Sequence, residues 1–262
     1  MSGQQPRLLL LVVIFVYAAL LAPLVIVLGV SFNPGAGFDF PPKGVSLHWY
    51  ANFFSKEEFV SAFFKVSLVV GLLTALLATT FGSLAAIGLV RLRFTGREAV
   101  EAFFMTPLLV PHILLGAALY LFYARLGMKS SVLTILLAHL VIATPYVIRS
   151  VTAGLAGIDP GLEEAAMSLG ANRVQAFAKV TLPLVRSSLL SGAIFGFIIS
   201  FSDINLSLFL SGPGATTLPM QIFSEIQWGG DPTIAAASAL QIVTIGMLVL
   251  IVQRAFRLRF VV

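Results

Sequence analysis

Residues 163–183 read EEAAMSLGANRVQAFAKVTLP, a moderately polar, amphipathic segment in a chain that is otherwise almost entirely apolar. Its most distinctive residues are spaced in the pattern E-A-A-x3-G-x9-V-x-L-P. They are Glu164, Ala165, Ala166, Gly170, Val180, Leu182 and Pro183. The contrast between this polar segment and the apolar remainder of the chain favours a structured loop between membrane spans.

The first half of this loop is predicted to be a docking helix. If residues 161–169 are helical, Ala165, Ala166 and Leu169 share one face, and Gly170 then supplies a flexible stop. Two alanines give a shallow surface that suits the groove of another protein. Pro183 has the fixed geometry that suits the start of the next helix. The alternative is a helix that rests on the membrane surface.

The composition is that of a membrane protein. Of the 262 residues, 58% are hydrophobic and 10% are charged, whereas a soluble domain has about 25% charged residues. The net charge of +5 does not indicate nucleic-acid binding, because the basic residues flank apolar runs. Cysteine is absent, which excludes disulfides, thiol catalysis and Cys-ligated metals.

Six apolar segments are predicted to span the membrane as helices. They lie at 8–30, 66–90, 102–124, 131–148, 187–210 and 233–253. Each is close to the ~20 residues that cross ~30 Å of hydrocarbon. Backbone groups cannot go unpaired in lipid, so helices are expected rather than strands. The first segment is too long for a signal-peptide core and is expected to stay as an uncleaved anchor.

The placement of Lys and Arg predicts that both termini and the loop 150–186 are cytoplasmic. The residues on that side are Arg7, Arg91, Arg93, Arg97, Arg149, Arg173, Lys179, Arg186, Arg254, Arg257 and Arg259. The opposite side holds Lys43, Lys56, Lys65, Arg125 and Lys129. Short helices are expected in two outer loops, around Trp49–Phe54 and Met220–Trp228. Residues 1–262 are interpreted as a single transmembrane domain.

The loop motif closely resembles the EAA loop of the membrane subunits of bacterial ABC importers, with Val180 in place of the usual Ile. Three further stretches are similar to the inner-membrane subunit of spermidine/putrescine importers of the PotC type: WYANFF, RLRFTGRE and SFSDINLSLFLSGPGATTLPMQIFSEI. Such permeases tend to carry an Asp-Asp pair in the fifth span, where this chain has Ser202-Asp203. The resemblance covers nearly the whole chain and implies an all-α, type I (MetI-like) permease fold with cytoplasmic coupling helices, in a bacterial inner membrane.

The resemblance also implies partners. Two permease subunits, identical or paired with a PotB-like partner, would form the pathway, and a periplasmic solute-binding protein would deliver the solute. Two cytoplasmic ATPases would dock on the EAA loops, where Leu169 joins the motif residues. This chain has no G-x4-G-K-[ST] loop, so ATP and Mg are expected on the ATPase, with no cofactor and no catalysis here. A polyamine is the expected solute; an opine, aminoethylphosphonate or ferric iron is the alternative.

Asp203 is the only Asp, Glu, Lys or Arg inside the six predicted spans. A charge at that depth costs at least ~2.5–3.5 kcal/mol and usually faces a cavity or a partner. A polar patch in the solute path is therefore predicted from Ser202, Asp203, Asn205 and Glu225. The alternative is a structural hydrogen bond to a neighbouring helix or to the partner subunit.

The remaining polar and small residues of the spans are interpreted structurally. His112 and His139 lack a second ligand at i+3 or i+4, so packed histidines are expected rather than a metal site. Gly192 and Gly196 predict close helix packing, within or between subunits. A membrane enzyme would need clustered His, Asp or Glu. A stand-alone channel or secondary carrier would need internal repeats and would leave the EAA loop unexplained.

Overall fold

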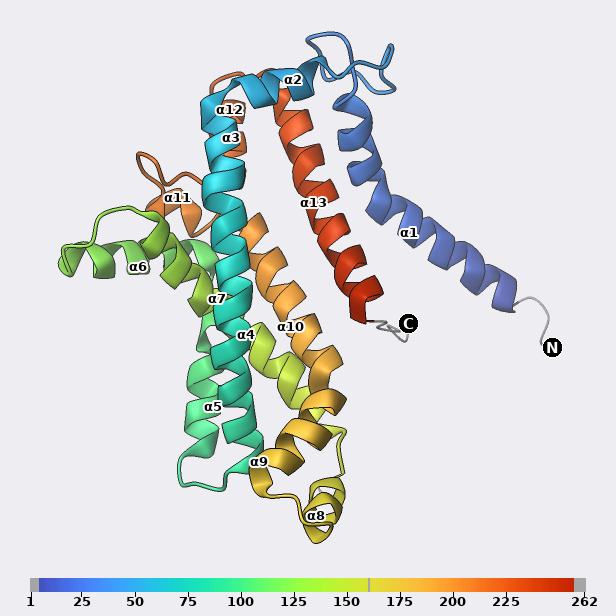
Figure 1. Cartoon of the computed structure of the whole chain (residues 1–262). Coiled ribbons are helices and arrows are strands. Elements are labelled where there is room, and N and C mark those ends of the chain that lie inside the picture. The colour runs from blue at the N-terminus through green and yellow to red at the C-terminus, as the bar shows by residue number, and fades with distance from the viewer. Residues whose placement is uncertain (1–4, 160, 257–262) are drawn as a thin grey trace. The chain divides into compact units, whose positions relative to one another are not determined.

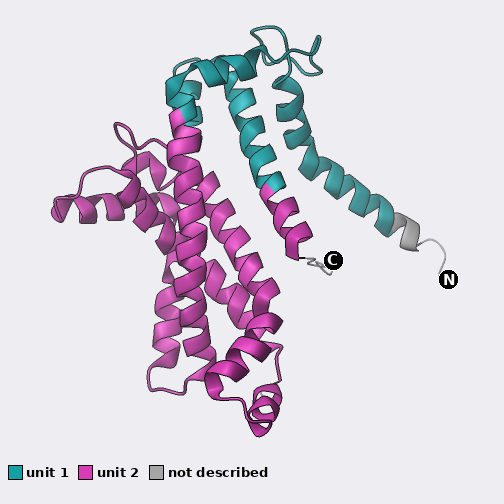
Figure 2. Ribbon diagram, in the orientation of Figure 1, with its two compact units in different colours: residues 1–60, 221–247 teal, residues 61–220, 248–262 magenta. Residues whose placement is uncertain are grey.

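The computed structural model describes residues 5–159 and 161–256, with side chains from residue 9 onward. Regular structure in these ranges is helical (Figure 1). Contacts divide the chain into two compact units (Figure 2): unit 1 comprises residues 1–60 and 221–247, and unit 2 comprises residues 61–220 and 248–262. Two basic residues that the orientation prediction counted, Arg257 and Arg259, lie outside the described residues.

Unit 2 carries the motif loop and the helices around it. Its elements are η1 (Ser61–Ser67), α4 (Leu68–Arg91), α5 (Arg97–Met105), η2 (Thr106–Leu108), α6 (His112–Arg125), α7 (Val132–Ala156), α8 (Gly161–Ser168), α9 (Arg173–Ala176), η3 (Phe177–Thr181), α10 (Leu182–Ser202) and α11 (Ser207–Leu210). Five helices of the described chain are long and apolar enough to cross a membrane, and the bent pair α5–η2 and α6 adds a sixth if it counts as one span.

The core of unit 2 is formed by α4, α7 and α10, which pack against one another. Small residues allow this close approach. A Cβ atom added at Gly192 would lie 3.3 Å from Val147 of α7, and one at Gly196 would lie 3.5 Å from the Ala75 backbone of α4. The predicted glycine contact is therefore made within the chain. Since lipid is as apolar as these side chains, such tight van der Waals packing is what holds membrane helices together.

The third predicted span, 102–124, is not one continuous helix. Its halves, Arg97–Leu108 and His112–Arg125, meet at an angle of 103°. The break coincides with Pro111, which has no N–H to donate and which disfavours helical geometry at the residue before it. Pro145, by contrast, lies inside α7 without ending that helix.

The fifth predicted span, 187–210, also differs from the structure. The helix begins earlier, at Arg173, and ends at Ser202. Asp203 is extended and caps the C-terminal end of α10, and α11 begins only at Ser207. Residues 203–206 are called the α10–α11 break below. The charged residue predicted to lie within a helix therefore lies between two helices, where its carboxylate accepts free backbone N–H groups at the start of α11.

Unit 1 consists of α1 (Gln5–Val30), α2 (His48–Ser55), α3 (Glu57–Val60) and most of α12 (Leu218–Gln227) and α13 (Thr233–Phe256). The short helices predicted in the outer loops are confirmed as α2 and α12. Asn52 of α2 donates to the Thr233 hydroxyl at 2.7 Å, and Lys56 lies 3.3 Å from the Asp231 carboxylate. Asp231 also accepts the Thr233 N–H at 2.9 Å and so caps α13.

Replacing Asp231 with Asn tests how much the charge of this contact stabilises unit 1. Burial pushes the pKa of Asp231 up, but hydrogen bonds from Thr233 and Lys56 and the Lys56 charge outweigh it, so the pKa lies below its usual value. A depressed pKa means that the stabilisation is present at neutral pH and is lost as the pH falls through the folded-state pKa. Asn keeps the cap, and the side chains of Lys56 and Asp231 are 30% and 37% exposed, so the pair contributes at most about 1 kcal/mol.

We expect Asp231→Asn to lower the unfolding temperature slightly at pH 7, and this difference to be smaller at pH 3, because the stabilisation decreases as the pH falls towards the folded-state pKa. Thermal unfolding of both proteins in detergent would measure it. An equal difference at both pH values would show that the charge is not responsible.

Candidate functional site

The motif loop folds as two short helices joined by a fixed turn. α8 ends in a Schellman motif: Ala171 N–H donates to the Ala166 carbonyl at 3.1 Å and Gly170 N–H to the Met167 carbonyl at 3.0 Å. Gly170 has φ of 94°, which glycine adopts without strain. Asn172 then begins α9 through a reciprocal capping box with Gln175. The predicted helix over 161–169 is thus confirmed, but Gly170 forms a defined turn rather than a flexible stop.

The sequence-predicted loop residues line the outside of this hairpin. Glu164, Ala165, Leu182 and Pro183 are exposed, whereas Ala166 and Val180 are half-buried. Leu169 is 90% exposed. Apolar neighbours extend the same exposed surface: Leu162, Met167 and Val174. An exposed apolar patch on a polar loop is typical of a protein-docking surface.

Pro183 is the second residue of α10, which directly follows the π-helical turn η3. Proline is tolerated in the first turn of a helix because its missing N–H would have no partner there. α10 begins one residue before Pro183, but α9 and η3 continue the helical run N-terminally, so the run as a whole starts at Arg173 and not at Pro183.

Sequence reasoning singled out Glu164 but passed over its neighbour Glu163. In the structure Glu163 forms a bidentate ion pair with Arg91, with oxygen–nitrogen distances of 2.6 and 2.9 Å, and accepts a hydrogen bond from the Thr181 hydroxyl. Partial burial raises the pKa of Glu163, but the hydrogen bonds from Thr181 and Arg91 and the Arg91 charge outweigh burial and hold the pKa below its usual value. Glu163 is therefore ionised at neutral pH.

Asp203 is buried at the α10–α11 break. Its side chain is 3% exposed, and one carboxylate oxygen accepts the N–H groups of Leu206 at 2.9 Å and Ser207 at 3.3 Å. The same oxygen lies 3.6 Å from Nε2 of His139 on α7. The carboxylate thus holds the backbone of the break and faces α7, at a distance from His139 longer than a hydrogen bond.

His139 connects this break to the helix core. Its Nδ1 lies 2.8 Å from the Ser200 hydroxyl, which donates to Thr74 of α4 at 3.3 Å. All three residues are buried. A packed, hydrogen-bonded histidine was predicted at this position, and the contacts confirm it. No group of three His, Asp or Glu side chains in the described part of the chain could hold a metal ion.

The other predicted path residues differ in their surroundings. Ser202 and Asn205, on either side of Asp203 in the chain, are exposed, so the break presents polar side chains outward while its acid is turned inward. Glu225 is half-buried and belongs to unit 1.

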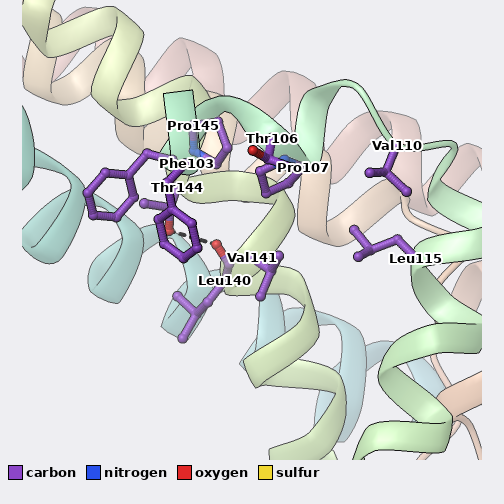
Figure 3. Close-up of a pocket in the computed structure, with 10 residues that line it drawn as sticks. Phe103, Thr106, Pro107, Val110, Leu115, Leu140, Val141, Thr144 and Pro145 are labelled. Atoms are coloured by element: carbon purple, nitrogen blue, oxygen red, sulfur yellow. Dashed lines mark hydrogen bonds between the residues drawn. The ribbon is translucent and has the colours of Figure 1, made fainter. Parts of the chain in front are cut away.

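An apolar cavity of about 410 Å³ lies beside the bend of the third span, between α5–η2–α6 and α7 (Figure 3). It is lined by Phe103, Phe104, Thr106, Pro107, Val110, Leu115, Leu140, Val141, Thr144 and Pro145. Both threonine hydroxyls donate to the carbonyl four residues earlier, Ala102 and Leu140 respectively. Because it lacks a charged side chain, this cavity offers no partner for a charged solute.

Comparison with known proteins places these features in context. Residues 78–262 match the family described as binding-protein-dependent transport system inner membrane component. The spermidine/putrescine transport system permease protein PotC of Haemophilus influenzae is 34% identical over 238 residues, which cover 91% of this chain and 92% of that protein. The putrescine transport system permease protein PotI of Escherichia coli K12 is 33% identical, covering 88% of this chain and 84% of that protein.

A solved structure shares the fold. It is a bacterial ABC transporter involved in the import of the acidic polysaccharide alginate, matched with a TM-score of 0.76 at 17% identity over 97% of this chain and 95% of that one. The predicted all-α importer-permease fold is confirmed by this match, which at such low identity concerns the fold alone.

Proposed function

The chain belongs to the inner-membrane components of binding-protein-dependent transport systems, and on this premise we propose that it forms half of the pathway for a polyamine or a related small charged organic solute. At the coarser level it is the multi-pass permease subunit of an ABC importer in the inner membrane. Such a subunit is not catalytic and binds no cofactor, because ATP binds to the ATPase subunits of the complex, which also includes a periplasmic binding protein.

The observation that supports the solute assignment is the length of the match to the polyamine permeases. About nine-tenths of the chain aligns with PotC and PotI, including the region of the α10–α11 break. An acid at that break suits a cationic solute. Ser202, in the place where polyamine-type permeases tend to carry a second Asp, favours a smaller cation or a zwitterion as the second candidate.

We assign the motif loop to ATPase docking. Its exposed residues provide an apolar, shallow surface with one carboxylate, Glu164, at its start. This assignment requires the loop and both termini to be cytoplasmic, as the distribution of Lys and Arg indicates. A second permease subunit, identical or PotB-like, completes the pathway. Ser202, Asp203 and Asn205 of unit 2 and, separately, Glu225 of unit 1 are the polar residues that we propose for this chain's half of the pathway.

Reconstitution tests this function. The permease, coexpressed with the ATPase and the binding protein of its transport system, should copurify with the ATPase. Proteoliposomes of the complex should accumulate radiolabelled putrescine or spermidine only with ATP inside and binding protein outside. Uptake of an opine, aminoethylphosphonate or ferric iron, with no uptake of polyamine, would reassign the solute. Uptake by the permease alone would contradict the importer assignment.

A further inference from the structure

Three elements of unit 2 meet at Glu163. Arg91 is the last residue of α4, Glu163 lies in the first turn of α8, and Thr181 is the last residue before α10. The Arg91 guanidinium binds both carboxylate oxygens of Glu163, and the Thr181 hydroxyl donates to one of them. The Arg91 guanidinium also lies 3.4 Å from the Thr181 hydroxyl, so the three side chains close a triangle.

This contact differs from an ordinary surface ion pair. The side chain of Glu163 is 17% exposed, that of Arg91 is 31% exposed, and Thr181 is fully buried. Two parallel N–H···O bonds between a guanidinium and a carboxylate also fix orientation, which a single exposed pair does not. The arrangement therefore holds α8 in a defined position.

α8 depends on this contact more than a core helix would. It has no buried residue among those described, so apolar packing anchors it weakly. The helices at the other corners of the triangle, α4 and α10, pack on each other and on α7 to form the core of unit 2. Glu163 therefore joins α8 to this core by direct side-chain hydrogen bonds, beside the contacts that α8 makes with α9 and η3.

We propose that Arg91, Glu163 and Thr181 form a mechanical link, by which displacement of the motif loop by an ATPase moves α4 and α10. This inference rests on the docking role proposed above for the loop. Glu163 is a positioning residue here and not part of the docking surface, because both of its carboxylate oxygens are occupied within the chain. Its neighbour Glu164 is exposed and free to meet the partner.

The link can be measured in the permease itself, before any transport assay. Cysteine is absent from the chain, so Leu84→Cys on α4 and Ser168→Cys on α8, both exposed positions, can carry spin labels. Pulsed electron–electron double resonance on the full chain in lipid nanodiscs should give one narrow distribution of the distance between the two spin labels. Glu163→Gln keeps the shape and removes the charge, and loss of charge-assisted bonds shifts an equilibrium by about tenfold or more. We expect a broadened distribution in that variant.

Two further variants test whether the broadening is due to loss of the Arg91–Glu163 ion pair. Exchanging the charges, Arg91→Glu with Glu163→Arg, should restore the narrow distribution. Glu101→Gln, the same substitution at an exposed position of α5, should leave it unchanged. An unaltered distribution in Glu163→Gln would overturn the link.

Whether the link passes movement from the motif loop to α4 and α10 is tested in the reconstituted complex, with putrescine as the transported probe. Glu163→Gln should retain its bound ATPase and basal ATP hydrolysis, while solute imported per ATP hydrolysed falls about tenfold, matching the weakened link. The charge exchange should recover most of this ratio. A broadened distance distribution with an unchanged ratio would overturn the mechanical role. Failure of the wild-type permease to retain an ATPase would refute the proposed function instead, and the distance measurement would still decide whether the link exists.

Discussion

Replacing Asp203 with Asn should reduce solute uptake by about tenfold to a hundredfold, the size of a typical coupling free energy between a buried group and a separate binding site. Asn has nearly the same shape, and its carbonyl oxygen can still accept the N–H groups of Leu206 and Ser207. The start of α11 therefore stays capped. We expect normal amounts of permease in the membrane and normal ATPase docking. What the variant loses is the negative charge at the α10–α11 break.

A buried acid can influence a solute that it does not touch. In the low-dielectric interior a charge acts over a longer distance than in water, and Asp203 also holds the backbone that presents Ser202 and Asn205 outward. Initial rates of putrescine uptake in proteoliposomes, with ATP hydrolysis measured in the same vesicles, would quantify the loss.

The variant Asp203→Ala distinguishes a role of Asp203 in protein stability from a role in solute passage. Alanine leaves two buried N–H groups without an acceptor, at a cost of about 1–3 kcal/mol each, so this variant should be less stable and less abundant. Uptake at the wild-type rate in Asp203→Asn would mean that Asp203 is structural. The argument for a cationic solute would then lose its only support among the predicted spans.

The parts of the fold that the sequence predicted are those governed by length and apolarity. The six apolar runs and the short helix after residue 160 follow from hydrocarbon thickness and helical period, which are local properties. The breaks in the third and fifth spans are different. Pro111 made a bend foreseeable, but not its angle of 103°. The buried acid at the end of α10 faces His139, which lies more than sixty residues away from Asp203 in the chain.

In the candidate site, too, local features could be predicted from the sequence, whereas contacts between distant parts of the chain could not. The spacing of Glu164, Gly170 and Pro183 identified the loop, because these residues act through local geometry. Glu163 could not be identified in this way, since its partners Arg91 and Thr181 are brought together by the packing of α4 and α10. An acid near the start of a helix has a sufficient local explanation in the helix dipole, so nothing in the sequence marks Glu163 as the partner of Arg91 and Thr181.

Gly170 was correctly predicted to follow the end of the loop helix, but it does so by forming a defined turn and not as a flexible stop. Its φ of 94° and the two hydrogen bonds of the Schellman motif give the loop a rigid turn. A Cβ atom added there would meet nothing within 4 Å, so the chain itself leaves room for a larger side chain. The open space beside Gly170 is therefore available to a docked partner.

Gly170→Trp should consequently abolish ATPase coupling while the permease still inserts into the membrane. A non-glycine residue in this left-handed conformation costs about 1–2 kcal/mol, and the indole would occupy the space that we assign to the partner. Gly170→Asn is the matched control, because Asn tolerates the same backbone conformation and is small. It should bind ATPase almost as the wild type does, and Gly170→Ala should fall between the two, since it carries the strain without the bulk. Copurified ATPase and solute-dependent ATP hydrolysis measure all three. Normal coupling in Gly170→Trp would show that this turn does not face the ATPase.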